Sequence, residues 1–170
     1  MKFNHNLLKM RTERLLQKDA TSRSSVSYAA ARSVGVLFSV VDKAKHEVVK
    51  DFIKKLEHDG KQVTVMEYLP PDKQNFEFKF DFFTENDISF WGKITSANAL
   101  KFADTAFDYL FYLDTEPNPL MMHLLAMSKA KCRVGRQWQD SPSYFEFMVQ
   151  APSSVKDLAD TIHKYIIQLK

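Results

Sequence analysis

Residues 33–41 read Ser-Val-Gly-Val-Leu-Phe-Ser-Val-Val, a run of apolar, mostly β-branched side chains that do not alternate with charged ones. A strand that is buried on both faces, as in a parallel sheet, has this pattern. Asp42 follows and can cap a helix, whose apolar residues recur from Val48 to Leu56 before Gly60 ends it. Residues 62–68 form a second β-branched run, so residues 33–68 predict a β-α-β unit.

The same alternation of strand and helix continues to the end of the chain. Phenylalanine alternates with charged residues over 76–82, which predicts an edge strand. A helix is expected from Thr95 or Ser96, with Leu100 and Ala103 facing inward. The remaining expected elements are strands at 108–113, 131–134 and 144–149 and helices after 118 and over 155–169. This order predicts an α/β fold with a Rossmann-like, doubly wound, mainly parallel sheet and helices on both faces.

Composition bounds the possible functions. The 170 residues are 45% hydrophobic, enough for one domain, which we place at residues 33–170. Only four glycines occur, which argues against glycine-rich nucleotide loops. Cys132 is the only cysteine, so a cysteine zinc cluster is excluded, and its place in a strand favours a small buried hydrophobe. We therefore predict no metal and no cofactor.

Positive charge is concentrated at the N-terminus. Residues 1–32 hold seven basic and two acidic side chains, whereas the whole chain has a net charge of +3. We treat residues 1–32 as a basic arm, with a short helix at 4–18 and a serine-rich linker after it. The residues expected to bind a partner are Lys9, Arg11, Arg14 and Lys18. RNA, a ribonucleoprotein, an acidic protein or a membrane surface would suit such an arm, but the helix could equally pack on its own domain.

No apolar run approaches the length needed to cross a bilayer, and the first residues lack the apolar stretch of a secretory signal. These two observations predict a cytoplasmic protein.

Several stretches together resemble a bacterial family of uncharacterised proteins of about this length. They are Ser33–Val41, Phe80-Asp-Phe-Phe83, Phe90-Trp-Gly-Lys93, Phe107-Asp-Tyr-Leu110 through Glu116-Pro117 to Leu120, Ala126-Met-Ser-Lys-Ala-Lys131 and Val134-Gly135. The resemblance covers nearly the whole chain. It implies a cytoplasmic bacterial protein of unknown function.

A weaker resemblance is to the N-terminal Rossmann-like half of heptosyltransferase-type glycosyltransferases. It rests on Asp108–Leu113 and on Ala130–Gly135, which follow in the same order. Those enzymes hold the nucleotide-sugar mainly with a second domain that is missing here, and Val40-Val-Asp-Lys-Ala44 replaces their Gly-Asp-rich loop. The resemblance therefore implies a fold and no activity.

In an open parallel sheet, ligands bind beyond the carboxyl ends of the strands. The residues expected to bind a ligand there are Asp42, Lys43, Asp114, Glu116, Asn118 and Arg136. Lys43 and Arg136 could hold an anionic small molecule such as a phosphate, and Asp114 with Glu116 could act as acid and base. The structural alternative is that Asp42 and Asn118 only cap helices and the charges are solvated.

Two further features carry weaker hypotheses. Phe90 and Trp91, in a loop, could stack on a partner or fold back over the phenylalanine-rich edge strand, and we expect the latter. His123 and His163 lie on helices where no residue is expected to orient them, so we assign no catalytic residue.

The sequence does not identify a reaction, and we expect the chain not to be an enzyme. Our first hypothesis is a non-catalytic interaction module whose basic arm binds RNA, a ribonucleoprotein or an acidic protein. The alternative is a small enzyme or sensor that binds a phosphorylated or nucleotide-type ligand at the strand ends. A third possibility is self-assembly through the edge strand at 76–82.

Overall fold

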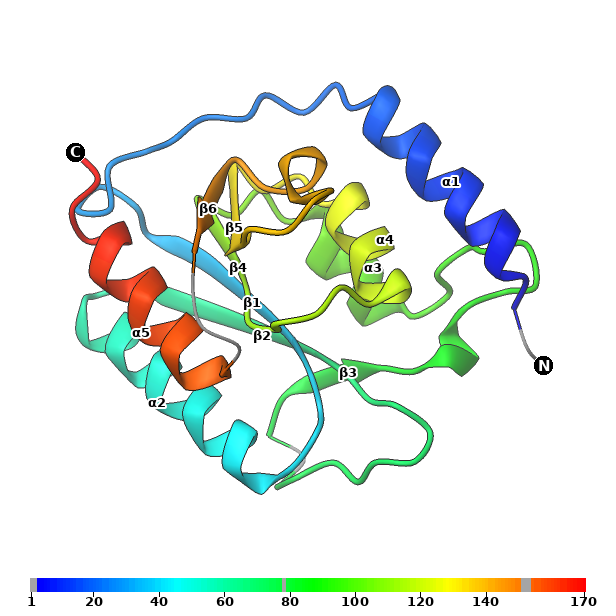
Figure 1. Cartoon of the computed structure of the whole chain (residues 1–170), viewed down its shortest axis with the longest axis horizontal. Coiled ribbons are helices and arrows are strands. Elements are labelled where there is room, and N and C mark those ends of the chain that lie inside the picture. The colour runs from blue at the N-terminus through cyan, green and yellow to red at the C-terminus, as the bar shows by residue number, and fades with distance from the viewer. Residues whose placement is uncertain (1–2, 78, 151–153) are drawn as a thin grey trace.

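The fold is a six-stranded, all-parallel sheet between two layers of helices (Figure 1). The computed structural model describes residues 3–77, 79–150 and 154–170. The strands are β1 (Ser33–Ser39), β2 (Gln62–Tyr68), β3 (Asp81–Phe83), β4 (Tyr109–Tyr112), β5 (Cys132–Arg136) and β6 (Phe147–Val149). Their order, β3-β2-β1-β4-β5-β6, is that of a doubly wound sheet, so the predicted fold class is confirmed.

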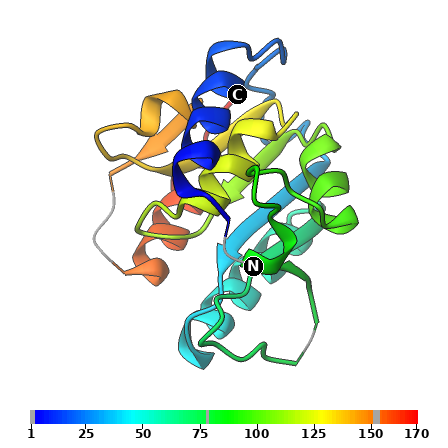
Figure 2. The same cartoon turned by 90° about the vertical axis from the view of Figure 1, so that its right-hand side faces the viewer.

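The helices divide between the two faces of the sheet, as Figures 1 and 2 show. Helices α2 (Lys43–His58) and α5 (Val155–Ile166) lie side by side on one face. Helices α1 (His5–Gln17), α3 (Ala97–Asp104) and α4 (Pro119–Met127) cover the other. Two short 3₁₀ segments, η1 (Glu85–Asp87) and η2 (Ser141–Ser143), lie in connections.

Strand β1 contributes to both apolar layers. Successive side chains of a strand point to opposite faces, so Val34, Val36 and Phe38 pack beneath α2 and α5 while Leu37 packs beneath α3 and α4. All four side chains are buried. This burial on both faces explains why the sequence of β1 is uniformly apolar.

The first and fourth strands meet at the switch point of the sheet. Strand β1 pairs in parallel with β2 along its whole length and with β4 from Val34 to Leu37. Strands β2 and β3 lie beyond β1 on one side of the sheet, and β5 and β6 lie beyond β4 on the other. The carboxyl ends of β1 and β4 therefore form the place where such folds usually hold ligands.

The basic N-terminal segment lies on the body of the protein. Helix α1 packs against α4, and the chain that follows it is held by hydrogen bonds to distant residues. The amide of Ser24 donates to the Lys131 carbonyl at 2.9 Å, and the Arg23 guanidinium donates to the carbonyls of Ser128 and Ala130. The arm is thus fixed in place next to the helices that it contacts.

Two local predictions were wrong. The expected edge strand at 76–82 is shorter and later, at Asp81–Phe83, and Glu77 has a positive φ of 62°, which is incompatible with an extended strand. Residue 78, within that expected strand, lies outside the described residues. Leu100, which was expected to face inward, is 37% exposed. Helix α3 begins after its Ser96 cap, and its buried face consists of Ala99, Phe102 and Ala103.

Gly135 of β5 gives a test of core packing. A Cβ atom at this position would lie 2.4 Å from Cζ of Phe145, so Gly135→Ala requires the ring to move. We expect a loss of about 1–3 kcal/mol in the free energy of unfolding, measured by urea titration. The double variant Gly135→Ala, Phe145→Leu should lose less than the sum of the two single variants. Strict additivity would contradict the packing argument.

Candidate functional site

A cluster of charged and polar side chains lies at the switch point of the sheet, where β1 and β4 end. Asp114 follows β4 and is buried beside Ser39, the last residue of β1. Its Oδ2 atom accepts from the Ser39 amide at 2.7 Å, and its Oδ1 atom accepts from the Ser39 hydroxyl at 2.8 Å. Lys45 in the first turn of α2 forms an ion pair with the same carboxylate and donates to the Ser39 carbonyl at 2.6 Å.

The cluster satisfies its own hydrogen-bonding groups. The Lys45 ammonium has three hydrogens and three acceptors nearby, which are Asp114 Oδ1, the Ser39 carbonyl and the Ser39 hydroxyl. Burial raises the pKa of Asp114, although Lys45 and Ser39 oppose that effect. A buried carboxylate that already accepts three hydrogen bonds within the protein has little capacity left for a ligand, so this arrangement favours a structural role.

The other residues expected at the strand ends have separate environments. Asp42 caps α2 by accepting from the Lys45 amide at 2.8 Å, and Asn118 caps α4 by accepting from the amides of residues 120 and 121. Lys43 is exposed at the start of α2. Glu116 is exposed, whereas Asp114 is buried, so the two carboxylates lie in different surroundings. One Nη atom of Arg136 donates to the Thr115 carbonyl at 3.0 Å.

Ser39 and Lys45 were missed by the sequence analysis. Lys45 lies among several lysines of the same helix, and nothing in its spacing distinguishes it from Lys43 or Lys50. Only the packing of α2 on the sheet brings its ammonium to Asp114.

A second buried polar group lies under the connection between β2 and β3. Glu67 of β2 is fully buried, and among the described residues neither of its carboxylate oxygens has a hydrogen-bond partner. The Nδ1 atom of His46 lies 3.9 Å from Glu67 Oε1, and the His46 ring contacts Phe76 and Phe80. Burial raises the pKa of Glu67 to about 7. This carboxyl is therefore partly protonated at neutral pH.

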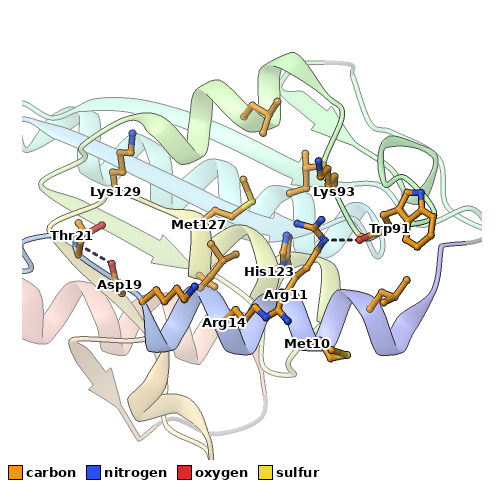
Figure 3. Close-up of a pocket in the computed structure, with 18 residues that line it drawn as sticks. Met10, Arg11, Arg14, Asp19, Thr21, Trp91, Lys93, His123, Met127 and Lys129 are labelled. Atoms are coloured by element: carbon orange, nitrogen blue, oxygen red, sulfur yellow. Dashed lines mark hydrogen bonds between the residues drawn. The ribbon is translucent and has the colours of Figure 1, made fainter.

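A large concavity lies over α1. Helix α1 forms one side of it, and His123 and Met127 of α4 contribute the floor (Figure 3). Leu100 of α3 also lines it. We call this cavity of about 860 Å³ the α1 groove. Its lining residues are Leu7, Met10, Arg11, Arg14, Leu15, Lys18, Asp19, Ala20, Thr21, Trp91, Gly92, Lys93, Ile94, Leu100, His123, Ala126, Met127 and Lys129. The volume lies within the range of ligand-binding sites.

One stripe of α1 faces the groove. The groove is lined at helical spacing by residues 7, 10, 11, 14, 15 and 18. Leu8 and Thr12 are buried on the packed side of the helix. Three of the four cations predicted to bind a partner, Arg11, Arg14 and Lys18, therefore lie in the groove. Lys9 is exposed and is not among the lining residues.

A tight turn presents Trp91 at one end of the groove. The Ser89 amide donates to the Lys93 carbonyl at 2.8 Å, and the Arg11 Nε atom donates to the Trp91 carbonyl at 2.7 Å. Gly92 has a φ of +76°, and a Cβ there would lie 3.0 Å from Cα of Leu8, so glycine permits the close contact with α1.

The aromatic pair in this turn points outward. Trp91 is 64% exposed and Phe90 44% exposed, and their rings meet edge to face at 5.4 Å. The expectation that this pair folds back over the edge strand was wrong. The backbone of the turn is fixed to α1, which leaves the side chains at the rim.

The floor of the groove is neutral. Thr12 Oγ1 lies 2.9 Å from the Leu8 carbonyl, to which it donates, and 2.8 Å from His123 Nδ1. A hydroxyl has one hydrogen, so Nδ1 of the imidazole acts as the donor to Thr12. Burial lowers the pKa of His123 to about 4, with a further contribution from Arg11. Thr12 thus orients His123, which the sequence analysis had not anticipated.

The rim, in contrast, is cationic. Five basic side chains and one carboxylate line the groove. The carboxylate, Asp19, pairs with Arg23 at 2.7 Å, and Lys129 pairs with Asp104 at 3.0 Å. The remaining four cations of the lining, Arg11, Arg14, Lys18 and Lys93, give the groove a positive potential.

Other kinds of site find little support. Cys132 is buried in β5, as predicted, and burial raises its thiol pKa to about 11. Across residues 3–77, 79–150 and 154–170, no group of three or more His, Cys, Asp or Glu side chains is arranged to hold a metal ion. Within the same residues, no helix combines the length and the apolar character that a bilayer span requires.

Comparison with known proteins identifies a family but no activity. The profile of a family of unknown function, DUF6913, matches residues 4–169. The match includes α1 and its groove as well as the sheet. No curated protein matches the chain.

The Lys45–Asp114 pair predicts a large loss of stability when one partner is removed. Lys45→Met leaves a buried carboxylate without its cation, and we expect a cost of about 3–5 kcal/mol in the free energy of unfolding at pH 8. The double variant Lys45→Met, Asp114→Leu should recover most of this loss. A loss below about 1 kcal/mol for Lys45→Met in urea titrations would contradict the assignment.

Glu67 predicts a pH dependence of stability. A carboxyl whose pKa rises from 4.5 to about 7 on folding binds its proton more tightly in the folded state. Its contribution is therefore fully present below pH 4.5 and is lost as pH rises through 7, by up to about 3 kcal/mol. We expect Glu67→Gln to flatten this decline and to exceed the wild type in stability at pH 8. Parallel pH profiles for the two proteins would exclude the assignment.

Proposed function

We propose that this chain, which belongs to the DUF6913 family of unknown function, is a non-catalytic interaction module that binds an anionic macromolecule in the α1 groove. The observation that carries the proposal is the convergence of Arg11, Arg14 and Lys18, from α1 and its C-terminal cap, with Lys93 of the Trp91 turn around one cavity. Such a field attracts an acidic partner and speeds its association.

The fixed position of α1 supports a binding role. Helix α1 is packed on α4 through Leu8 and Thr12, so Arg11, Arg14 and Lys18 are held on one side of it. Binding to a preformed surface costs less conformational entropy than folding a free arm onto its partner. The linker contacts of Arg23 and Ser24 hold the other end of the segment.

The chemistry of the buried groups also favours binding over catalysis. The Ser39 hydroxyl donates to Asp114 and is not next to a free base. The Cys132 thiol has a raised pKa, which disfavours the nucleophilic thiolate. A phosphorylated ligand at the strand ends has less support, because Lys45 and Ser39 already occupy the oxygens of Asp114.

Charge reversal in the groove tests the proposal. Arg14 and Lys18 are exposed, and Arg14→Glu, Lys18→Glu should weaken binding of polyanions at least tenfold. The matched control is Lys54→Glu, Lys164→Glu, which changes the net charge equally on the opposite helix layer. The measurement is fluorescence anisotropy with two labelled probes, a polyglutamate peptide and a single-stranded RNA of mixed sequence.

The salt dependence completes the test. Wild-type affinity should fall steeply between 50 and 500 mM NaCl, because exposed charges are screened. The control variant should stay within about twofold of the wild type. If neither probe binds at 50 mM NaCl, or if both double variants lose affinity equally, the α1 groove is not the binding surface.

A further inference from the structure

We infer that the occupant of the α1 groove is an acidic, amphipathic segment of a partner protein, bound as a short helix. This inference rests on the proposed function and narrows it to one class of partner. Its basis is the chemistry of the groove, which combines a cationic rim with a mainly apolar lining.

The apolar part of the groove is open to solvent. Met10 is 50% exposed, Trp91 64% and Leu100 37%, and all three line the groove from different elements. Leu7 and Met127, which are partly exposed, add apolar surface to the lining. Exposed apolar surface that is contiguous and rimmed by charges is characteristic of protein interfaces, where Trp, Met and Arg are enriched.

The same features disfavour nucleic acid. Single-stranded nucleic acid is held by successive aromatic platforms beside its phosphates. Trp91 is the one exposed aromatic side chain in the described lining, because Phe90, which meets its ring edge to face, lies outside the lining. The other apolar side chains of the lining are aliphatic or methionine. Aliphatic side chains would remove water from phosphates without replacing its hydrogen bonds. Leucine-like side chains of a peptide would instead bury their own apolar surface there.

The length and the ends of the groove fit a helix. Helix α1 has 13 residues, which corresponds to about 20 Å, or three to four turns of a parallel partner helix. In Figure 3, Trp91 lies at one end of the groove and Lys129 at the other, with Arg11 and Arg14 between them. An occupant with apolar residues at i, i+3, i+4 and i+7 and acidic residues beside them would match this arrangement.

The neutral floor of the groove determines where we expect charged and apolar residues on the partner helix. His123 is uncharged at physiological pH because burial lowers its pKa to about 4, so positive charge is confined to the rim. Acidic residues of the partner should therefore lie along the edges of its helix. Its central stripe should be apolar and should contact Leu100 and Met127.

The test is a selection of random 16-residue peptides displayed on phage against the full chain. Any basic surface enriches acidic peptides, so the selected peptides are then synthesised and measured against apolar variants. Trp91→Ala and Leu100→Asp should each weaken binding at least tenfold. Their controls, Ile167→Ala and Tyr165→Asp, alter exposed apolar residues of the opposite layer and should stay within about twofold. Circular dichroism should show helix gained on binding.

The outcomes separate the two proposals. Selected peptides that bind equally well to Leu100→Asp would overturn the inference, as would a selection without an acidic, helically spaced consensus. If the RNA probe binds in the groove with a dependence on Arg14 and Lys18 but not on Leu100, the partner is a nucleic acid. In that case the proposed function stands and the inference fails. If neither peptides nor RNA bind, both fail.

Discussion

Burial of β1 between two parallel neighbours is the constraint on which the rest of the structure depends. Its backbone pairs with β2 on one side and β4 on the other, and its side chains enter both apolar layers. A parallel pair cannot be closed by a tight turn, so the chain must cross over through α2 on one face and α3 and α4 on the other. The position of α4, on which α1 packs, follows from that requirement.

The polar groups of the protein differ in how completely they are satisfied. At the strand ends, Asp114, Lys45 and Ser39 bind one another, so an internal ion pair lies at the usual ligand position of a doubly wound sheet. The α1 groove instead keeps cations at a solvent-filled rim around apolar surface. A fold does not dictate the location of its function. The binding surface that we propose for this protein lies instead on the outer helix layer, over α1.

Much of the fold could be predicted from local patterns. The apolar run of β1, the Asp42 cap and Gly60 identify the first β-α-β unit, and the later elements follow with shifts of a few residues. The alternation of phenylalanine with charged residues predicted a strand that begins at residue 76, whereas β3 begins at Asp81. Alternation alone does not provide a neighbouring strand with which to pair. Arg11, Arg14 and Lys18 could be selected as candidate binding residues from the charge of the N-terminal segment alone. Trp91, Leu100 and His123 could not be placed beside them, because their proximity depends on contacts across 80 or more residues.

The sequence by itself determined the parallel α/β architecture, the basic character of the N-terminal segment and the buried state of Cys132. These properties depend on hydrophobic periodicity, residue composition and short-range capping, all of which act between neighbours in the chain. Only the tertiary structure decided that α1 lies on α4, that Lys45 rather than Lys43 reaches Asp114, and that a groove opens between α1 and α3. Those outcomes depend on which surfaces meet when the helix layers close over the sheet, a relation between distant residues that no local pattern contains.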